Sequence, residues 1–384
     1  MAAPASIEVH GTHDKAFEPV RRAFEENFTE HGELGAAVSV VVDGKAVVDL
    51  WAGHADASRD RPWERDTIVN VYSTTKGMAA LCGHILADRG QLDFEAPVVE
   101  YWPEFGQAGK ETMPVAYLFS HQAGLYAVTA ELKGDEALDW DTMTGLLAAQ
   151  EPLWTPGEKQ GYHAVTFGYL VGEIVRRISG RTIGTFLADE VTGPLGVDFL
   201  IGTPAGEDHR IADMQQPAPP PADAPASPLN DPDGPFARAT RMRSNLDVNS
   251  REWRAAEIPS SNGHGNARAL ARIYGALARG GEIDGVSLLS AEAIKRAAAE
   301  RVSSHDEVLP MATRRSLGYM LPLGDLDQRG PNAFGHAGMG GSLGYADPDT
   351  KLGFGYVMNQ MWSGGMMSPD PRAGSLVKAL NESL

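Results

Sequence analysis

Ser73 and Lys76 have the identities and the separation of a catalytic nucleophile and its base. Apolar residues recur at helical spacing from Met78 to Leu86, which predicts an amphipathic helix with one buried face. Because residues three apart are neighbours on a helix surface, the lysine amine can reach the serine hydroxyl. The first turn of a helix also offers unpaired N–H groups to a developing oxyanion.

The Ser-x-x-Lys spacing is not specific by itself. The chain has a second copy, Ser375 and Lys378, in what we predict to be an ordinary C-terminal helix. A serine that caps a helix beside a solvated lysine gives the same pattern. A catalytic role for Ser73 therefore needs support from other parts of the chain.

Tyr162 is a second candidate, because it follows a turn at Pro156 and Gly157 and precedes a predicted helix. It either packs at the start of that helix or exchanges protons with Ser73 and Lys76.

A third candidate region is a predicted strand that ends in a glycine-rich turn. This region is either a plain strand and turn or a strand beside the nucleophile. In the second case its backbone pairs with substrate, and the Met339 N–H joins that of Ser73 in an oxyanion hole. The residues concerned are His336, Ala337, Gly338, Met339 and Gly340.

Two other possible nucleophiles are disfavoured. Ser342 lies in a Gly-x-Ser-x-Gly pattern, but that motif needs a following helix and a later histidine, and no histidine follows His336. Cys82 is the single cysteine, so no intrachain disulfide can form, and its place on the apolar helix face predicts a buried core residue.

His121 is expected to stabilise its loop through hydrogen bonds. Residues 258–266 either border the site or form a capping loop.

Strand patterns at both ends of the chain enclose a mainly helical middle. We therefore predict an α+β protein with an antiparallel sheet built from both termini and an inserted helical domain. The expected domains are 1–72 with 260–384, and 73–259, which includes a proline-rich excursion at 216–235. The expected strands are 36–42, 45–51, 334–338, 343–346 and 352–358, and the expected helices are 13–31, 141–150, 163–179, 182–190, 266–279 and 290–301.

The overall composition restricts the partners. A net charge of −18 over 384 residues disfavours nucleic acid and anionic membranes. The sequence contains no run of about 18 apolar residues, so no membrane span is predicted. The N-terminus lacks the features of a signal peptide, and we therefore expect a cytoplasmic location. No spacing of metal ligands and no phosphate or dinucleotide motif is present, so we expect no metal and no cofactor. The sequence gives no indication of oligomeric state.

Four groups of residues occur together in one order along the chain. They are Ser73 to Lys76, Leu118 to Leu125, Tyr162 after Pro156 and Gly157, and His336 to Gly338. This order resembles the serine β-lactamase and penicillin-binding protein family, in its class C-like branch, and most closely the family VIII carboxylesterases. The resemblance runs from about residue 20 to 380 and implies a β-lactamase-like fold.

The resemblance also implies roles for these residues. Ser73 would be the acyl-accepting nucleophile, Lys76 would take its proton, and Tyr162 would pass protons to the leaving group. The N–H groups of Ser73 and Met339 would bind the oxyanion, and His336 would replace the basic residue of the family's Lys-Thr-Gly motif.

Two departures from the family pattern indicate the substrate. Ala164 replaces an asparagine that would bind an acylamino group, and His336 is a mostly neutral side chain where the family has a permanent cation. We therefore expect a serine carboxylesterase acting on short-chain esters. The alternatives are a β-lactamase or D-amino-acid peptidase-like amide hydrolase, an acyltransferase, or an inactive binding protein. An inactive protein would have lost Ser73, Lys76 or Tyr162, and all three are present.

Overall fold

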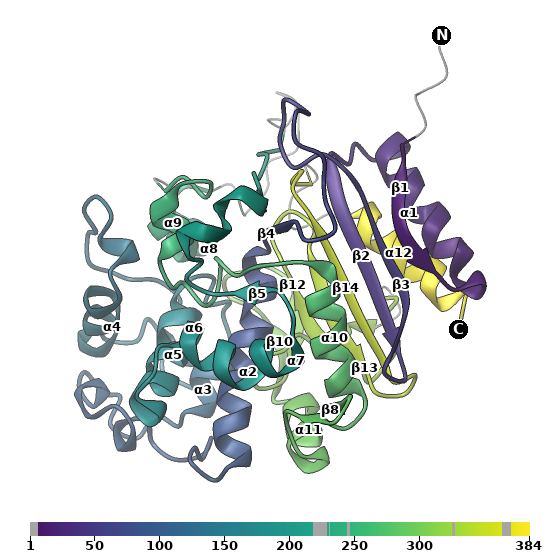
Figure 1. Cartoon of the computed structure of the whole chain (residues 1–384). Helices are drawn as coiled ribbons and strands as arrows, with labels where there is room; N and C mark the ends of the chain where they lie inside the picture. Colours follow the sequence, from purple (N-terminus) through teal and green to yellow (C-terminus); the bar gives the residue numbers. More distant parts are fainter. Residues whose placement is uncertain (1–6, 218–228, 230, 244–245, 325–326, 363–369) are drawn as a thin grey trace.

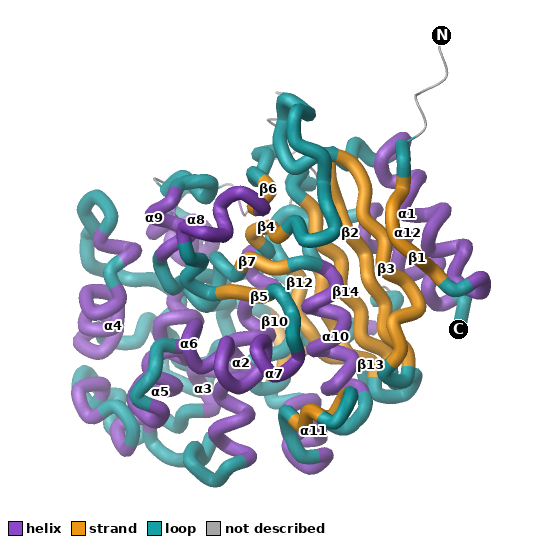
Figure 2. Tube along the Cα trace, viewed as in Figure 1, coloured by secondary structure: helices purple, strands orange, loops and turns teal. Residues whose placement is uncertain are grey.

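A six-stranded antiparallel sheet forms the centre of the fold (Figures 1 and 2). The computed structural model describes residues 7–217, 229, 231–243, 246–324, 327–362 and 370–384. The strand order is β1-β3-β2-β14-β13-β12, so segments from both ends of the chain build one sheet. The strands are β1 (Val9–His13), β2 (Gly35–Val42), β3 (Lys45–Gly53), β12 (Phe334–Ala337), β13 (Leu343–Asp347) and β14 (Leu352–Met358).

The predicted strands 36–42 and 45–51 are confirmed, and they form a hairpin at the start of the sheet. Strands β2 and β3 pair in antiparallel register from Val42 opposite Lys45. Asp43 and Gly44 between them have φ angles of 46° and 84°, which the Asp-Gly pair adopts readily in a tight turn. The next neighbour of β2 is β14, from the other end of the chain, with Val38 opposite Tyr356.

Helices cover both faces of the sheet. Helices α1 (Glu18–Glu30) and α12 (Pro371–Asn381) pack together on one face, and α10 (Ala267–Ala278) crosses the other (Figure 1). Glycines on β14 allow α10 to approach closely, since a Cβ on Gly353 would lie 2.1 Å from the Gly275 nitrogen. The predicted α+β sheet flanked by helices and built from both termini is therefore confirmed.

The helical middle of the chain is arranged around α2 (Thr75–Asp88), which contacts α5 (Thr166–Ser179) and α6 (Ile183–Leu187). The prediction that this helix buries only one face was wrong, because every residue from Thr75 to Leu86 is buried. The other elements are α3 (Ala116–Phe119), α4 (Trp140–Ala149), α7 (Gly193–Leu195), α8 (Pro235–Thr240), α9 (Arg251–Ala255), α11 (Ala291–Ala298), β4 (Ile68–Asn70), β5 (Phe199–Leu200), β6 (Ile211–Ala212), β7 (His264–Gly265), β8 (Glu282–Ile283), β9 (Val286–Ser287), β10 (Val302–His305) and β11 (Ala312–Arg315).

Most of the proline-rich excursion predicted at 216–235 lies outside the described residues, and the domain boundaries stay a prediction.

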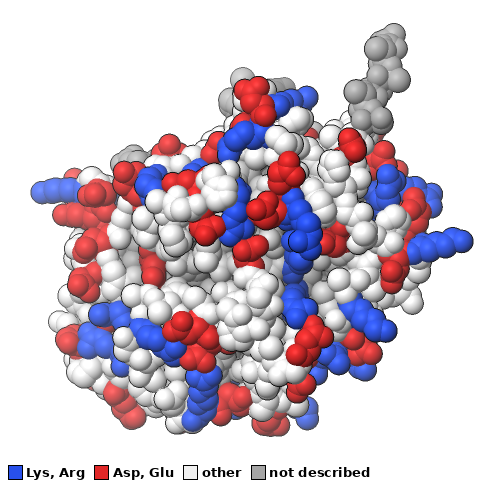
Figure 3. All heavy atoms as spheres, in the orientation of Figure 1, with Lys and Arg blue, Asp and Glu red and all other residues white. Residues whose placement is uncertain are grey.

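Acidic and basic side chains are interspersed over the face of the molecule seen in Figure 3. None of the helices in the described ranges is long and apolar enough to cross a membrane.

Candidate active site

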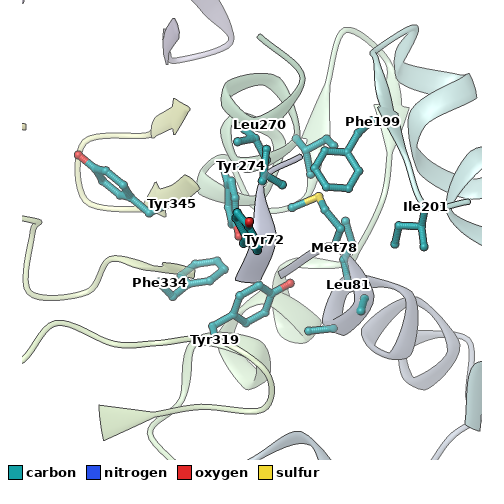
Figure 4. Packing of buried hydrophobic residues seen from close by; sticks show 14 of the residues in the cluster. Tyr72, Met78, Leu81, Phe199, Ile201, Leu270, Tyr274, Tyr319, Phe334 and Tyr345 are labelled. Carbon is teal, nitrogen blue, oxygen red and sulfur yellow. The ribbon is translucent and has the colours of Figure 1, made fainter. Parts of the chain in front are cut away.

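Ser73 lies in a single turn of 3-10 helix, Tyr72–Thr74, immediately before α2. Tyr72 has a φ of +44°, a conformation that costs free energy in a residue other than glycine and that occurs often at functional sites. Tyr72 of this turn packs in the buried hydrophobic cluster that also contains Tyr274 and Phe334 (Figure 4). The sequence prediction that Ser73 lies at the start of a helix is confirmed.

Lys76 points its amine at Ser73. Its Nζ donates to the Ser73 Oγ at 3.1 Å, and also to the carbonyls of Ala164 at 2.8 Å and Ser260 at 3.0 Å. The lysine side chain is completely buried. Two backbone carbonyls therefore fix the amine in the orientation that serves the serine hydroxyl.

Tyr162 lies over the same amine, with the Lys76 Nζ 4.7 Å from the centre of its ring. The segment that carries Tyr162 is anchored by a buried carboxylate, since the Tyr162 N–H donates to Asp306 Oδ1 at 3.1 Å. Asp306 in turn pairs with the buried Arg315 at 2.6 Å. The structure thus brings the three residues predicted from the sequence, Ser73, Lys76 and Tyr162, into one place.

Two histidines beside Tyr162 are neutral and structural. His163 Nε2 accepts the Leu125 N–H at 3.1 Å, so the proton is on Nδ1, which donates to the Gly161 carbonyl at 2.6 Å. Burial lowers the pKa of His163 to about 4. His121 accepts the His163 N–H at 3.0 Å, and burial lowers its pKa well below 6.5. Both rings hold their loops in place, as the sequence predicted for His121.

The third predicted region lies on β12 and the turn at residues 338–342. The His336 ring stacks on Tyr162 with 6.1 Å between ring centres, and its Nδ1–H donates to the Ala337 carbonyl at 2.6 Å. Burial, together with the Lys76 charge, lowers the pKa of His336 well below 6.5. His336 is therefore neutral at pH 7 and brings no positive charge to this part of the site.

Gly338 places this strand end directly against the nucleophile turn. A Cβ on Gly338 would lie 2.1 Å from Ser342 Oγ and 2.3 Å from the Val71 carbonyl oxygen. Met339 follows in the turn, and no carbonyl within the described ranges accepts a hydrogen bond from its N–H. The Met339 N–H is thus available to a ligand.

Ser342 is a structural serine. Its buried Oγ donates to the Val71 carbonyl at 2.8 Å and lies 3.0 Å from Thr74 Oγ1. Strand β13 follows it where a nucleophile elbow would need a helix. The sequence argument against Ser342 as nucleophile agrees with this geometry. The prediction that Cys82 is a core residue is also confirmed, because its thiol is fully buried and burial raises its pKa.

Sequence reasoning missed several contributors to the site. Ala164 and Ser260 contribute backbone carbonyls, which have no side-chain signature in a sequence. Residues 258–266, left open as a site border or a capping loop, do both, since Asn266 accepts the Ala269 N–H at the start of α10. Asp306 and Arg315 gave no signal because no motif surrounds them.

Comparisons with known proteins agree on the family. The Beta-lactamase family model matches residues 20–378. The chain is 38% identical over 381 residues to Esterase/beta-lactamase LipL of Mycobacterium tuberculosis (strain ATCC 25618 / H37Rv), covering 94% of this chain and 85% of the relative. Among solved structures, a family VIII carboxylesterase is 42% identical with a TM-score of 0.90, and the match covers 98% of this chain and 100% of that one.

A penicillin-binding protein homolog from Caulobacter crescentus is 40% identical with a TM-score of 0.89, again covering 98% of this chain and 100% of the other. Both the fold class and the resemblance inferred from the sequence are confirmed by these matches. From its match to the family model over residues 20–378 and from relatives this similar, the chain belongs to the beta-lactamase family.

Proposed function

We propose that this protein is a serine hydrolase that cleaves short-chain carboxylic esters through an acyl-enzyme on Ser73. The observation that carries the proposal is the 3.1 Å hydrogen bond from the buried Lys76 Nζ to the Ser73 Oγ. An amine held against a hydroxyl in this way is the arrangement of an activated serine nucleophile. Relatives of 38% and 42% identity are named an esterase/beta-lactamase and a carboxylesterase, which supports the same activity.

The reaction has two halves. The Ser73 Oγ attacks the ester carbonyl while neutral Lys76 takes its proton, and the N–H groups of Ser73 and Met339 bind the oxyanion. Tyr162 gives a proton to the alkoxide as the carbon–oxygen bond breaks, which leaves an acyl group on Ser73. Water then attacks the acyl carbonyl while the Tyr162 phenolate takes its proton, and Lys76 returns its proton to the Ser73 Oγ as the acid leaves.

The surroundings of the site favour esters over β-lactams. A β-lactam carries a carboxylate, yet the third region contributes the neutral His336. Ala164 turns its carbonyl to Lys76 and has only a methyl group as side chain, so it offers no amide to a substrate acylamino group. A neutral carboxylic ester needs neither contact.

β-Lactam hydrolysis is the second candidate, because two similar proteins are named as an esterase/beta-lactamase and a penicillin-binding protein homolog. Acyl transfer to an alcohol is an alternative fate of the same acyl-enzyme. The expected cytoplasmic location stays a prediction, which cell fractionation would test.

The test compares p-nitrophenyl acetate, butyrate and octanoate with nitrocefin. We expect ester turnover to vanish in Ser73→Ala and to persist in Ser342→Ala and in Ser375→Ala, which removes the other Ser-x-x-Lys serine. A fluorophosphonate probe should label the wild type and both controls but not Ser73→Ala. Full labelling of Ser73→Ala would contradict the proposal, and nitrocefin turnover equal to ester turnover would put the second candidate first.

A further inference from the structure

The turn at residues 338–342 has to be held in place if it is to bind an oxyanion. It contains Gly340 and Gly341, with φ angles of +90° and +128°, and glycine backbones are the most flexible in a protein. Oxyanion stabilisation depends on donors that are oriented before the reaction begins. The motif residues Ser73, Lys76 and Tyr162 do not supply this restraint on the far side of Met339.

Arg372, on the first turn of α12, supplies it. Its Nη2 donates to the Gly340 carbonyl at 2.8 Å, and the Trp362 N–H donates to the same carbonyl at 3.0 Å. The Arg372 side chain is 1% exposed, so these bonds form away from water. The peptide between Gly340 and Gly341, in the same turn as Met339, is thereby fixed in place.

Arg372 is itself held in one orientation by two acids, the buried Glu33 and the partly buried Asp370. Its Nε and Nη2 donate to the two carboxylate oxygens of Asp370 at 3.0 and 2.7 Å, and its Nη1 donates to Glu33 Oε1 at 3.0 Å. Nη1 also donates to the Gln360 carbonyl at 2.8 Å, and the Tyr356 hydroxyl donates to Glu33 Oε2. The guanidinium group is thus bonded on every side.

The cluster also fits tightly against the turn. A Cβ on Gly341 would lie 2.1 Å from Asp370 Oδ2 and 3.0 Å from Arg372 Nη2. A shift of the guanidinium therefore displaces the turn. Buried ion pairs often stabilise a fold no more than apolar residues of the same size would, so stability alone does not account for this cluster.

We propose that Arg372 is a positioning residue for the oxyanion hole, acting through the Gly340 carbonyl on the orientation of the Met339 N–H, with Glu33 orienting Arg372. This inference rests on the proposed ester hydrolysis. Arg372 touches the turn and not the substrate. Because the oxyanion exists only in the transition state and intermediate, its loss should lower kcat and leave KM nearly unchanged.

The test is Arg372→Lys, which keeps the charge but cannot bond Gly340, Asp370 and Glu33 together. With p-nitrophenyl butyrate we expect kcat to fall about tenfold or more and KM to stay within about twofold. Affinity for a trifluoromethyl ketone, which forms an oxyanion adduct on a serine, should fall by the same factor as kcat/KM. The control is Arg177→Lys, which alters an ion pair with the buried Glu173 on α5. It should leave kcat, KM and the affinity for the trifluoromethyl ketone unchanged.

If Arg372→Lys does not fold, Glu33→Gln takes its place in an assay at about pH 8, because it keeps the shape and removes the charge that Glu33 carries above a pKa of about 7. We expect the same pattern, with a fall in kcat of about threefold. Wild-type kcat and inhibitor affinity in a folded variant would overturn the role of Arg372, as would a change confined to KM. Ester turnover that survives Ser73→Ala would instead overturn the proposed function, so the two failures are distinguishable.

Discussion

Glu33 should make the stability of this fold depend on pH. Burial raises the pKa of its carboxyl from 4.5 to about 7, and the repulsion of Asp370 adds to this, against the opposing effects of the Arg372 charge and the Tyr356 hydrogen bond. Between pH 4.5 and about pH 7, Glu33 keeps its proton in the folded protein but has released it in the unfolded chain. The stabilisation is therefore complete below pH 4.5 and is lost as pH rises through 7.

Glu33→Gln removes this titration and keeps the shape of the side chain. A rise from 4.5 to about 7 in pKa is worth about 3 kcal/mol of unfolding free energy, most of which lies between about pH 5 and pH 8. Wild type should therefore lose about 2–3 kcal/mol of unfolding free energy relative to Glu33→Gln across that range.

Urea unfolding of the two proteins at four pH values between about 5 and 8 measures this difference. Groups that titrate in the same way in both proteins cancel in the comparison. A difference in unfolding free energy that stays constant with pH would show that Glu33 is ionised throughout, and it would refute the argument from burial.

Three further predictions concern the nucleophile turn and its neighbours. Ser342→Ala should lower the unfolding free energy by about 1–3 kcal/mol in urea, since it removes the donor to the Val71 carbonyl, and it should still label with fluorophosphonate; loss of the label would contradict a structural role. Gly338→Ala should cut p-nitrophenyl butyrate turnover by about a hundredfold, because its Cβ would lie 2.3 Å from that carbonyl; near-normal turnover would show that the contact relaxes. Cys82 should react with Ellman's reagent only after unfolding, since burial raises its pKa, and rapid reaction of the native protein would contradict this.

The sequence predicted those parts of the site that are carried by side chains in motifs. Ser73, Lys76 and Tyr162 were found because a nucleophile, an amine and a phenol recur in a recognisable order. The carbonyls of Ala164 and Ser260 were not found, because every residue has a carbonyl and only the fold decides which ones meet an amine.

Two errors in the predicted fold have physical causes. Helix α2 was expected to expose a polar face, but its polar residues are buried with partners of their own, as His84 Nε2 is with the Leu317 carbonyl. Strand β1 was not predicted because it is an edge strand whose middle residues are exposed, so its sequence lacks apolar alternation. Arg372 was not singled out from the sequence, because nothing local to α12 marks it as buried.

The position of β14 sets an order of events during synthesis. This strand fills the place beside β2, yet it follows β2 by about 300 residues along the chain. At about 5–20 residues per second the ribosome needs roughly 15 to 60 seconds to supply it. Until then the β2–β3 hairpin has a free, valine-rich edge on which another nascent chain can pair. Slower translation lengthens this interval and should therefore lower the yield of folded protein.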